Sequence, residues 1–225
     1  MIETYPMRIN KYLAHKKYST RRGADELIEA GKVTINGSVA KLGDKVSETD
    51  VVVVDSKAIS AITKKHVYFV FNKPIGIVTH SPQRGEKSIE HISGLGSRVF
   101  PVGRLDKDSH GLIILTSDGR VTEALLNPDR EHEKEYRVRV DKSLSEHFFT
   151  QMAKGVKIED YLTKKARVEG EPGSKTFTIV ISEGKKHQIR RMATTLGYTV
   201  EDLQRVRVGN IELGELPVGH KRQLT

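Results

Sequence analysis

Cysteine and tryptophan are both absent from the 225 residues of this chain, and no stretch approaches 18 consecutive apolar residues. The lack of cysteine excludes disulfides and thiolate metal sites. The lack of a long apolar run, and of an apolar signal region at the N-terminus, argues against membranes and secretion, so we expect a cytoplasmic protein. No GxGxxG loop follows a strand pattern and no histidines cluster at ligand spacing, so we expect neither a cofactor nor a metal ion.

Positive charge is present in excess, because 38 lysines and arginines face 29 acidic residues and give a net charge of +9. Such a balance suggests a polyanionic partner, although it is also common on solvated surfaces, so the distribution of charge decides. The segment from residue 8 to residue 22 contains no acidic residue, whereas a merely solvated face would mix both signs. Its six basic residues are Arg8, Lys11, Lys16, Lys17, Arg21 and Arg22.

Residues 1–54 have the pattern of two short helices followed by a small sheet. Apolar residues recur at helical spacing in the first helix, and Ser19 or Thr20 can cap the second. Residues 33–39 then alternate around an Asn-Gly pair, which is the sequence of a tight hairpin, and residues 51–54 supply one more strand. We therefore expect a small α+β domain here.

This order of elements, with Ser-x-Arg-Arg in the turn between the helices, resembles the RNA-binding domain of ribosomal protein S-four. The resemblance implies that four cations of the helices and the turn contact RNA phosphates, namely Arg8, Lys11, Arg21 and Arg22. The alternative is an ordinary basic face on a small domain. Residues 55–65 lack a sustained period, and we interpret them as a linker to a second domain of residues 66–225.

A polar loop between two apolar runs is the most informative segment of this second domain. The runs at residues 99–102 and 112–115 predict buried strands, and Gly103 and Gly111 bracket the loop between them. The short connection places one arginine and two carboxylates at the rim of a rigid sheet, namely Arg104, Asp106 and Asp108.

Two further segments carry candidate site residues. Residues 132–140 alternate as a strand that turns Tyr136 towards the core. A strand at residues 177–181 then turns at a glycine into a helix that ends before Gly197, and cations gather at its start. Because the free N–H groups of a helix N-terminus favour anions, phosphate contact is the simple interpretation for Lys185, Lys186 and Arg191.

The ten residues 103–112, in the order G-R-L-D-K-D-S-H-G-L, resemble the signature of RNA pseudouridine synthases, in the branch that modifies ribosomal RNA and carries a small RNA-binding domain in front. Three other blocks are similar to motifs of the same family: Asn-Lys-Pro-x-Gly at 72–76, Lys-x-Tyr at 134–136 and Glu-Gly-x-x-His-Gln-Ile-Arg at 183–190. The resemblance implies an α+β chain, whose catalytic domain is a mixed, mainly antiparallel sheet flanked by helices.

The resemblance also implies an activity, the isomerisation of uridine to pseudouridine in RNA without cofactor or metal. Asp106 would be the catalytic carboxylate, Tyr136 would lie against the target base, and Arg190 would pair with Asp106. Asp106 could attack the sugar, attack the base or start a glycal route. Arg104 could fill the stack that an extruded uridine leaves, or could instead form an ion pair with Asp108.

Within the family, the runs at 132–136, 163–168 and 187–192 are most similar to the F-type subgroup, which acts on large-subunit ribosomal RNA, so we expect a 23S target and a monomeric enzyme. Sister enzymes act on small-subunit RNA or transfer RNA. Two other classes of function are considered. A non-catalytic RNA-binding or ribosome-assembly factor would need only the basic front domain, and a nucleoside or glycoside hydrolase would use Asp106 with Asp108.

Overall fold

The computed structural model describes residues 5–16, 18–55, 66–96, 99–127 and 131–224, and these form two compact units. One unit contains the described residues up to His66 together with Asp118–Arg120, and the other contains the remainder. Apart from Asp55, the segment interpreted as a linker lies outside the described residues. No helix among the described residues has both the length and the apolar character that a bilayer span requires.

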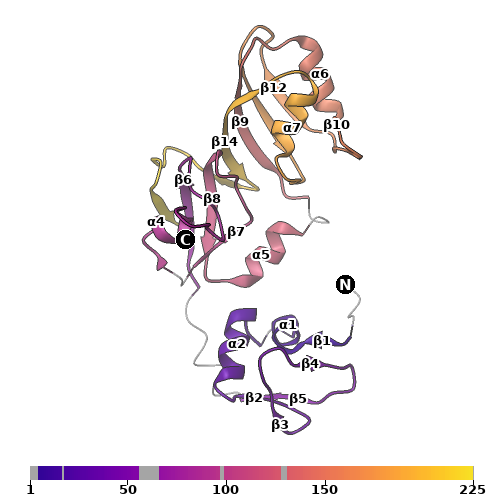
Figure 1. Cartoon of the computed structure of the whole chain (residues 1–225), viewed down its shortest axis with the longest axis vertical. Coiled ribbons are helices and arrows are strands. Elements are labelled where there is room, and N and C mark those ends of the chain that lie inside the picture. The colour runs from indigo at the N-terminus through magenta and orange to yellow at the C-terminus, as the bar shows by residue number, and fades with distance from the viewer. Residues whose placement is uncertain (1–4, 17, 56–65, 97–98, 128–130, 225) are drawn as a thin grey trace. The chain divides into compact units, whose positions relative to one another are not determined.

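The first unit has the expected order of two helices and a small sheet (Figure 1). Its elements are β1 (Met7–Arg8), α1 (Ile9–His15), α2 (Arg21–Glu29), β2 (Val33–Ile35), β3 (Ser38–Val39), β4 (Lys45–Val46) and β5 (Val52–Val54). Thr20 caps α2, because its hydroxyl accepts a hydrogen bond from Gly23 N at 3.1 Å. Asn36 and Gly37 both have positive φ, as a tight two-residue hairpin turn requires.

The core of this unit explains why the two helices form. Ile9 and Leu13 of α1 pack against Leu27 and Ile28 of α2 and against Val33 of the sheet. The cations of the two helices and of the N-cap of α1 lie on the outside, where Arg8, Lys11, Arg21 and Arg22 are all exposed. The predicted division of α1 into an apolar face and a basic face is therefore confirmed.

The second unit is built on a nine-stranded mixed sheet with the order β12-β13-β9-β14-β8-β6-β16, with β7 beside β8 and β15 beside β14. Neighbouring strands run antiparallel except β8 and β14, which run parallel. The strands are β6 (Tyr68–Lys73), β7 (Phe100–Val102), β8 (His110–Thr116), β9 (Lys134–Val140), β12 (Arg167–Gly170), β13 (Thr176–Ile181), β14 (Val200–Val208), β15 (Ile211–Glu212) and β16 (Lys221–Gln223). A separate hairpin consists of β10 (Lys157–Ile158) and β11 (Tyr161–Leu162).

Helices cover this sheet in two places (Figure 1). Helices α6 (Glu146–Lys154) and α7 (Gln188–Thr195) pack on β9, β13 and β14, where Phe148 and Met192 are fully buried. At β8, residues 112 and 114 pack in the cluster that contacts α5 (Gly119–Leu126), whereas residues 113 and 115 pack in the cluster that contains α4 (Ile89–Ile92). Because β8 is buried on both faces, its sequence is continuously apolar instead of alternating.

Two local predictions were wrong. The sequence Ser143-Leu144-Ser145-Glu146 has the pattern of a capping box and predicts a helix that starts after Ser143 and ends before Gly155. The end is confirmed, but Ser145 is the N-cap of α6, and its hydroxyl accepts from Phe148 N at 3.2 Å. Leu144 is buried, so the chain is still anchored to the core at the residue directly after the expected cap, Ser143. The Pro-x-Gly sequence within residues 72–78 predicts a turn that leads into a second strand, but Val78 forms only an isolated bridge with Ser88.

Candidate active site

The signature loop connects β7 to β8, the strand of the sheet that is buried on both faces. Leu105 points into the core with 7% exposure, whereas Asp106 next to it is partly exposed and Arg104 and Asp108 are exposed. Buried Leu105 thus lies between residues whose polar side chains are accessible to solvent. Arg104 therefore stands free of the core, and the ion pair of Asp108 is made with another residue.

Asp106 has His187 as its neighbour. The Nε2 atom of His187 lies 3.5 Å from Asp106 Oδ1, a distance at which an ionic contact is loose. His187 is the N-cap of α7 and has a φ of 52°, in the left-handed region that few residues other than glycine adopt. This strained backbone turns the imidazole towards the loop. The sequence interpretation gave His187 no catalytic role, and a left-handed conformation leaves no signal in the sequence.

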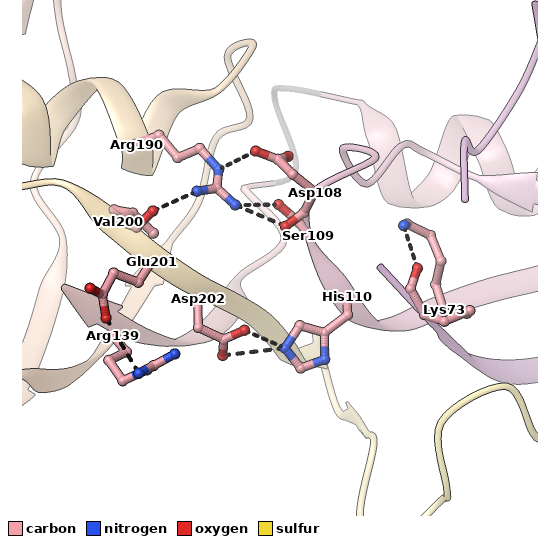
Figure 2. Close-up of polar contacts among 10 residues, drawn as sticks. Lys73, Asp108, Ser109, His110, Arg139, Arg190, Val200, Glu201 and Asp202 are labelled. Carbon is pink, nitrogen blue, oxygen red and sulfur yellow. Dashed lines mark hydrogen bonds and ion pairs between the residues drawn. The ribbon is translucent and has the colours of Figure 1, made fainter. Parts of the chain in front are cut away.

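Arg190 ties the loop to β14, as Figure 2 shows. Its Nη2 donates to the backbone oxygen of Asp108 at 3.0 Å and reaches Ser109 Oγ at 3.4 Å, while Nη1 donates to Val200 O at 2.9 Å. Its Nε lies 3.2 Å from Asp108 Oδ2, which is close enough for an ion pair, although Nε donates no hydrogen bond. The guanidinium is thus held mainly by backbone oxygens.

The expected pairing of Arg190 with Asp106 is therefore not the one that the structure contains. Arg190 lies three residues beyond His187, almost one turn further along α7, and so reaches Asp108 instead. His187 contacts the first carboxylate of the loop and Arg190 contacts the second. The alternative of an ion pair between Arg104 and Asp108 is not found among the described residues either.

Tyr136 lies on the core side of β9, as expected, with 8% of its surface exposed. It is paired with Ile179 of β13 and Arg205 of β14, and it belongs to the same apolar cluster as Leu105. Leu105, which directly precedes Asp106, and Tyr136, which is predicted to contact the base, therefore belong to one cluster. Through Leu105, the signature loop is therefore attached to the apolar core that contains Tyr136.

Lys73 is fully buried at the end of β6, and the sequence indicated no role for it beyond its place in the Asn-Lys-Pro-x-Gly block. Its Nζ donates to Pro74 O and Ile77 O, both at 2.8 Å. Burial lowers the pKa of Lys73 from 10.5 to about 8, while the carboxylates of Asp108 and Asp106 oppose this shift and Arg205 adds to it. Burial, followed by Arg205, also lowers the pKa of Lys134. Lys73 therefore lies near the two loop carboxylates, and Arg205 lies near both lysines.

Lys73 should make stability depend on alkaline pH. Because its pKa is lower in the folded protein than in the unfolded chain, the unfolded chain binds more protons between about pH 8 and 10.5, and stability rises with pH in that window. Lys73→Met removes this titration. In urea unfolding from about pH 7 to 10.5, we expect the free energy of unfolding of the wild type to rise by up to about 3 kcal/mol relative to that of the variant.

Lys73→Met also removes the donors to Pro74 O and Ile77 O, which lowers the stability of the variant at every pH. The test is therefore how the difference in free energy of unfolding between the wild type and Lys73→Met changes with pH. Lys87→Met, at an exposed lysine of the same unit, is the matched control and should follow the wild type. A constant difference between wild type and Lys73→Met across the window would contradict the lowered pKa.

The basic residues predicted around the start of α7 differ in how they are held. Lys186 is exposed, Lys185 lies 4.5 Å from the centre of the Tyr161 ring, and Arg191 forms an ion pair with Glu159 at 2.7 Å. Glu183 accepts from the hydroxyl of Tyr161 and, at 3.0 Å, from Lys164 N. Lys185 and Arg191 therefore contact the β10–β11 hairpin. They can bind RNA phosphates only if they do so while keeping these contacts or after giving them up.

Comparisons with known proteins agree on one family. The sequence model of the RNA pseudouridylate synthase family matches residues 67–195, and that of the S4 domain matches residues 7–52. The chain is 40% identical over 226 residues to the dual-specificity RNA pseudouridine synthase RluF of Escherichia coli strain K12, which covers all of this chain and 78% of that protein. It is 34% identical to ribosomal large subunit pseudouridine synthase B of Vibrio vulnificus, over 94% of this chain and 70% of that protein.

A crystal structure of a pseudouridylate synthase is similar over 97% of this chain and 96% of that one, with a TM-score of 0.70 and 30% identity. The similarity extends over the units that carry the basic helices and the signature loop, and it agrees with the expected order of a small front domain and a mixed sheet.

Proposed function

This chain belongs to the RNA pseudouridine synthases, which are isomerases, and we propose that it uses Asp106 to convert uridine to pseudouridine in large-subunit ribosomal RNA. In this reaction the bond between N1 of uracil and C1′ of ribose breaks, the base turns over, and a bond forms between C5 and C1′. The proton leaves C5 and N1 gains one, so that atoms and electrons balance without an oxidant or a cofactor.

The contrast between the two loop carboxylates carries the assignment of Asp106. Asp108 is engaged by Arg190 through its side chain and its backbone oxygen. Asp106 is 34% exposed and has only the loose contact to His187, so its oxygens remain accessible to a reacting atom. The buried Lys73 interacts electrostatically with both loop carboxylates, so a cation lies near the carboxylate that would act as nucleophile or base.

Tyr136, Arg104 and Arg190 receive three different roles. A uridine in structured RNA must be extruded at a cost of roughly a few kcal/mol, and the exposed Arg104 can occupy the vacated stack. Tyr136, in the same apolar cluster as Leu105, can lie against the extruded base and assist removal of the C5 proton. Arg190 holds the loop, through Asp108 and Ser109, at a fixed distance from β14.

The names of the relatives support ribosomal RNA as the substrate. The Vibrio vulnificus protein is named for the large ribosomal subunit, and the Escherichia coli protein is named for dual specificity towards RNA. We therefore place the enzyme in the cytoplasm with its ribosomal substrate, and we expect it to act as a monomer.

Two experiments test this function. The purified protein should form pseudouridine in an in vitro transcript of 23S ribosomal RNA, detected by nucleoside chromatography. Pseudouridine maps of ribosomal RNA and transfer RNA, from cells with and without the protein, should differ at a large-subunit position. A difference confined to small-subunit or transfer RNA would refute the proposed target while leaving the reaction intact.

We propose that the basic faces of α1 and α2 bind RNA phosphates, and this predicts how affinity depends on salt. Each phosphate contact contributes about 0.7 to 0.9 to the slope of log K against log salt. We therefore expect the slope, measured by filter binding, to become shallower by roughly three units when four exposed residues are replaced by alanine. These are Arg8, Lys11, Arg21 and Arg22.

Lys32→Ala provides the control, because Lys32 is a cation of the same unit that pairs with Asp55 at 3.4 Å. Its slope should match the wild type. If the fourfold variant also retained the wild-type slope, this face would be only solvated, and the RNA would have to be held by the second unit.

A further inference from the structure

Two buried side chains from outside the signature loop hold the backbone directly before Asp106. The hydroxyl of Thr79 donates to Leu105 O at 2.7 Å and accepts from Leu105 N at 3.1 Å. Thr79 is 7% exposed, and it lies 26 residues earlier in the chain than Leu105. One hydroxyl therefore satisfies both polar groups of a peptide segment that belongs to no regular ladder.

Arg205 of β14 holds both ends of the same loop. Its Nε donates to Leu112 O at 2.7 Å, and its Nη1 reaches Arg104 O at 3.3 Å. The side chain is buried, so these bonds are sheltered from competing water. The planar guanidinium of Arg205 thus connects Arg104, two positions before Asp106, with Leu112 of β8.

The position of Arg205 depends on a close approach of two strands. Arg205 is paired with Gly111 in the parallel pairing of β14 with β8. Gly111 has a φ of 106°, and a Cβ atom at this position would collide with the backbone oxygen of Arg205. Glycine is therefore required here both for its backbone conformation and for the contact that brings Arg205 beneath the loop.

These anchors matter because the side chain of Asp106 is itself held weakly. Its contact to His187 is 3.5 Å long, so the position of the carboxylate follows mainly from the position of its backbone. Misplacement of a reacting group by about 1 Å can cost about a hundredfold in rate. Fixing residues 104 and 105 therefore fixes the reacting oxygen.

We propose that Thr79 and Arg205 are positioning residues for Asp106, acting on the reaction through the backbone of residues 104, 105 and 112. The inference rests on the proposed role of Asp106. Neither residue carried a motif in the sequence, since Thr79 follows a turn and Arg205 belongs to an alternating strand. Their partners lie 26 and 101 residues away.

Thr79→Val tests the proposal with little change of shape, because it replaces only the hydroxyl by a methyl group. Single-turnover rates on a 23S transcript carrying tritium at C5 of uridine isolate the chemical step from RNA binding. We expect the rate to fall about 10- to 100-fold while the RNA Kd changes less than about threefold. Thr79→Ser restores the hydroxyl and should recover at least about a third of the wild-type rate.

Thr116→Val is the matched control. Thr116 is also fully buried, and its hydroxyl donates to Val67 O at 2.8 Å at the other end of β8. Thr116→Val should lower the free energy of unfolding about as much as Thr79→Val does, without a comparable loss of single-turnover rate. Arg205→Lys keeps the charge but cannot span both carbonyls, so its loss should combine with that of Thr79→Val less than additively.

Hydrogen exchange of the segment 103–112 gives a result that does not depend on activity. Thr79→Val should speed exchange of this segment, with Leu105 most affected, and Thr79→Ser should not. A wild type that forms no pseudouridine would refute the proposed function and leave hydrogen exchange to judge this inference. The inference is overturned if exchange is unchanged, if Thr79→Val keeps the wild-type single-turnover rate, if Thr116→Val loses as much rate, or if Thr79→Ser fails to recover.

Discussion

Asp106→Asn is expected to reduce pseudouridine formation by at least about 10⁴-fold while leaving RNA affinity within about threefold of the wild type. The amide preserves the shape of the carboxylate but removes the charge and the nucleophilic oxygen. Single-turnover rates on a 23S transcript measure the loss, and filter binding measures affinity. Because Asp106 makes only a loose contact to His187, the substitution should leave the free energy of unfolding nearly unchanged.

Asp108→Asn is the matched control for this result. Asp108 is 62% exposed, and its carboxylate pairs with Arg190, so its replacement disturbs the geometry of the loop without removing the reacting group. We expect a loss of rate of at most about fivefold, since an exposed ion pair contributes at most about 1 kcal/mol. If Asp106→Asn retained more than a tenth of the wild-type rate, the catalytic role would have to pass to Asp108.

Arg190→Ala is expected to have the second largest effect, a loss of about 10²- to 10³-fold in rate. It removes the donors to Asp108 O, Ser109 Oγ and Val200 O, and so releases the loop from β14. Arg190→Lys should lose less, because an ammonium group can keep part of these contacts but cannot reproduce the planar fork. Single-turnover kinetics and urea unfolding should both be measured.

Double-mutant cycles identify the carboxylate to which Arg190 is coupled. In urea unfolding, we expect Arg190→Lys and Asp108→Asn to be coupled by roughly 0.5 to 1 kcal/mol, the range for a partly exposed pair. Arg190→Lys and Asp106→Asn should add independently. Coupling to Asp106 instead would contradict the contacts described here and restore the pairing expected from the family resemblance.

Several local features could be predicted because their causes are local. Thr20 at the start of α2, Asn36-Gly37 in the hairpin and Gly155 after α6 each have a turn or cap chemistry that neighbouring residues alone decide. The start of α6 was misplaced by two residues, because Ser143 and Ser145 are equivalent cap candidates. Packing of Leu144 against the core selects between them.

The features of the site also fall into those that the local sequence predicts and those that it does not. The loop between β7 and β8 was predicted in its correct place, since two apolar runs around a polar segment leave little freedom. The ion pair of Arg190 was assigned to the wrong carboxylate. Asp106 and Asp108 lie two residues apart, and the left-handed conformation of His187 at the start of α7 governs which of them each side chain reaches.

By itself, the sequence determined the order of elements, the basic face of the first two helices and the identity of the loop that carries Asp106, because periodicity, capping and motif spacing act over a few residues. Only the tertiary structure decided which side chains hold that loop. The hydroxyl of Thr79 and the guanidinium of Arg205 contact the loop, and the position of Arg205 follows from sheet register and from the parallel pairing of β8 with β14. Contacts between residues up to about a hundred positions apart depend on the packing of the whole sheet, and no local pattern encodes them.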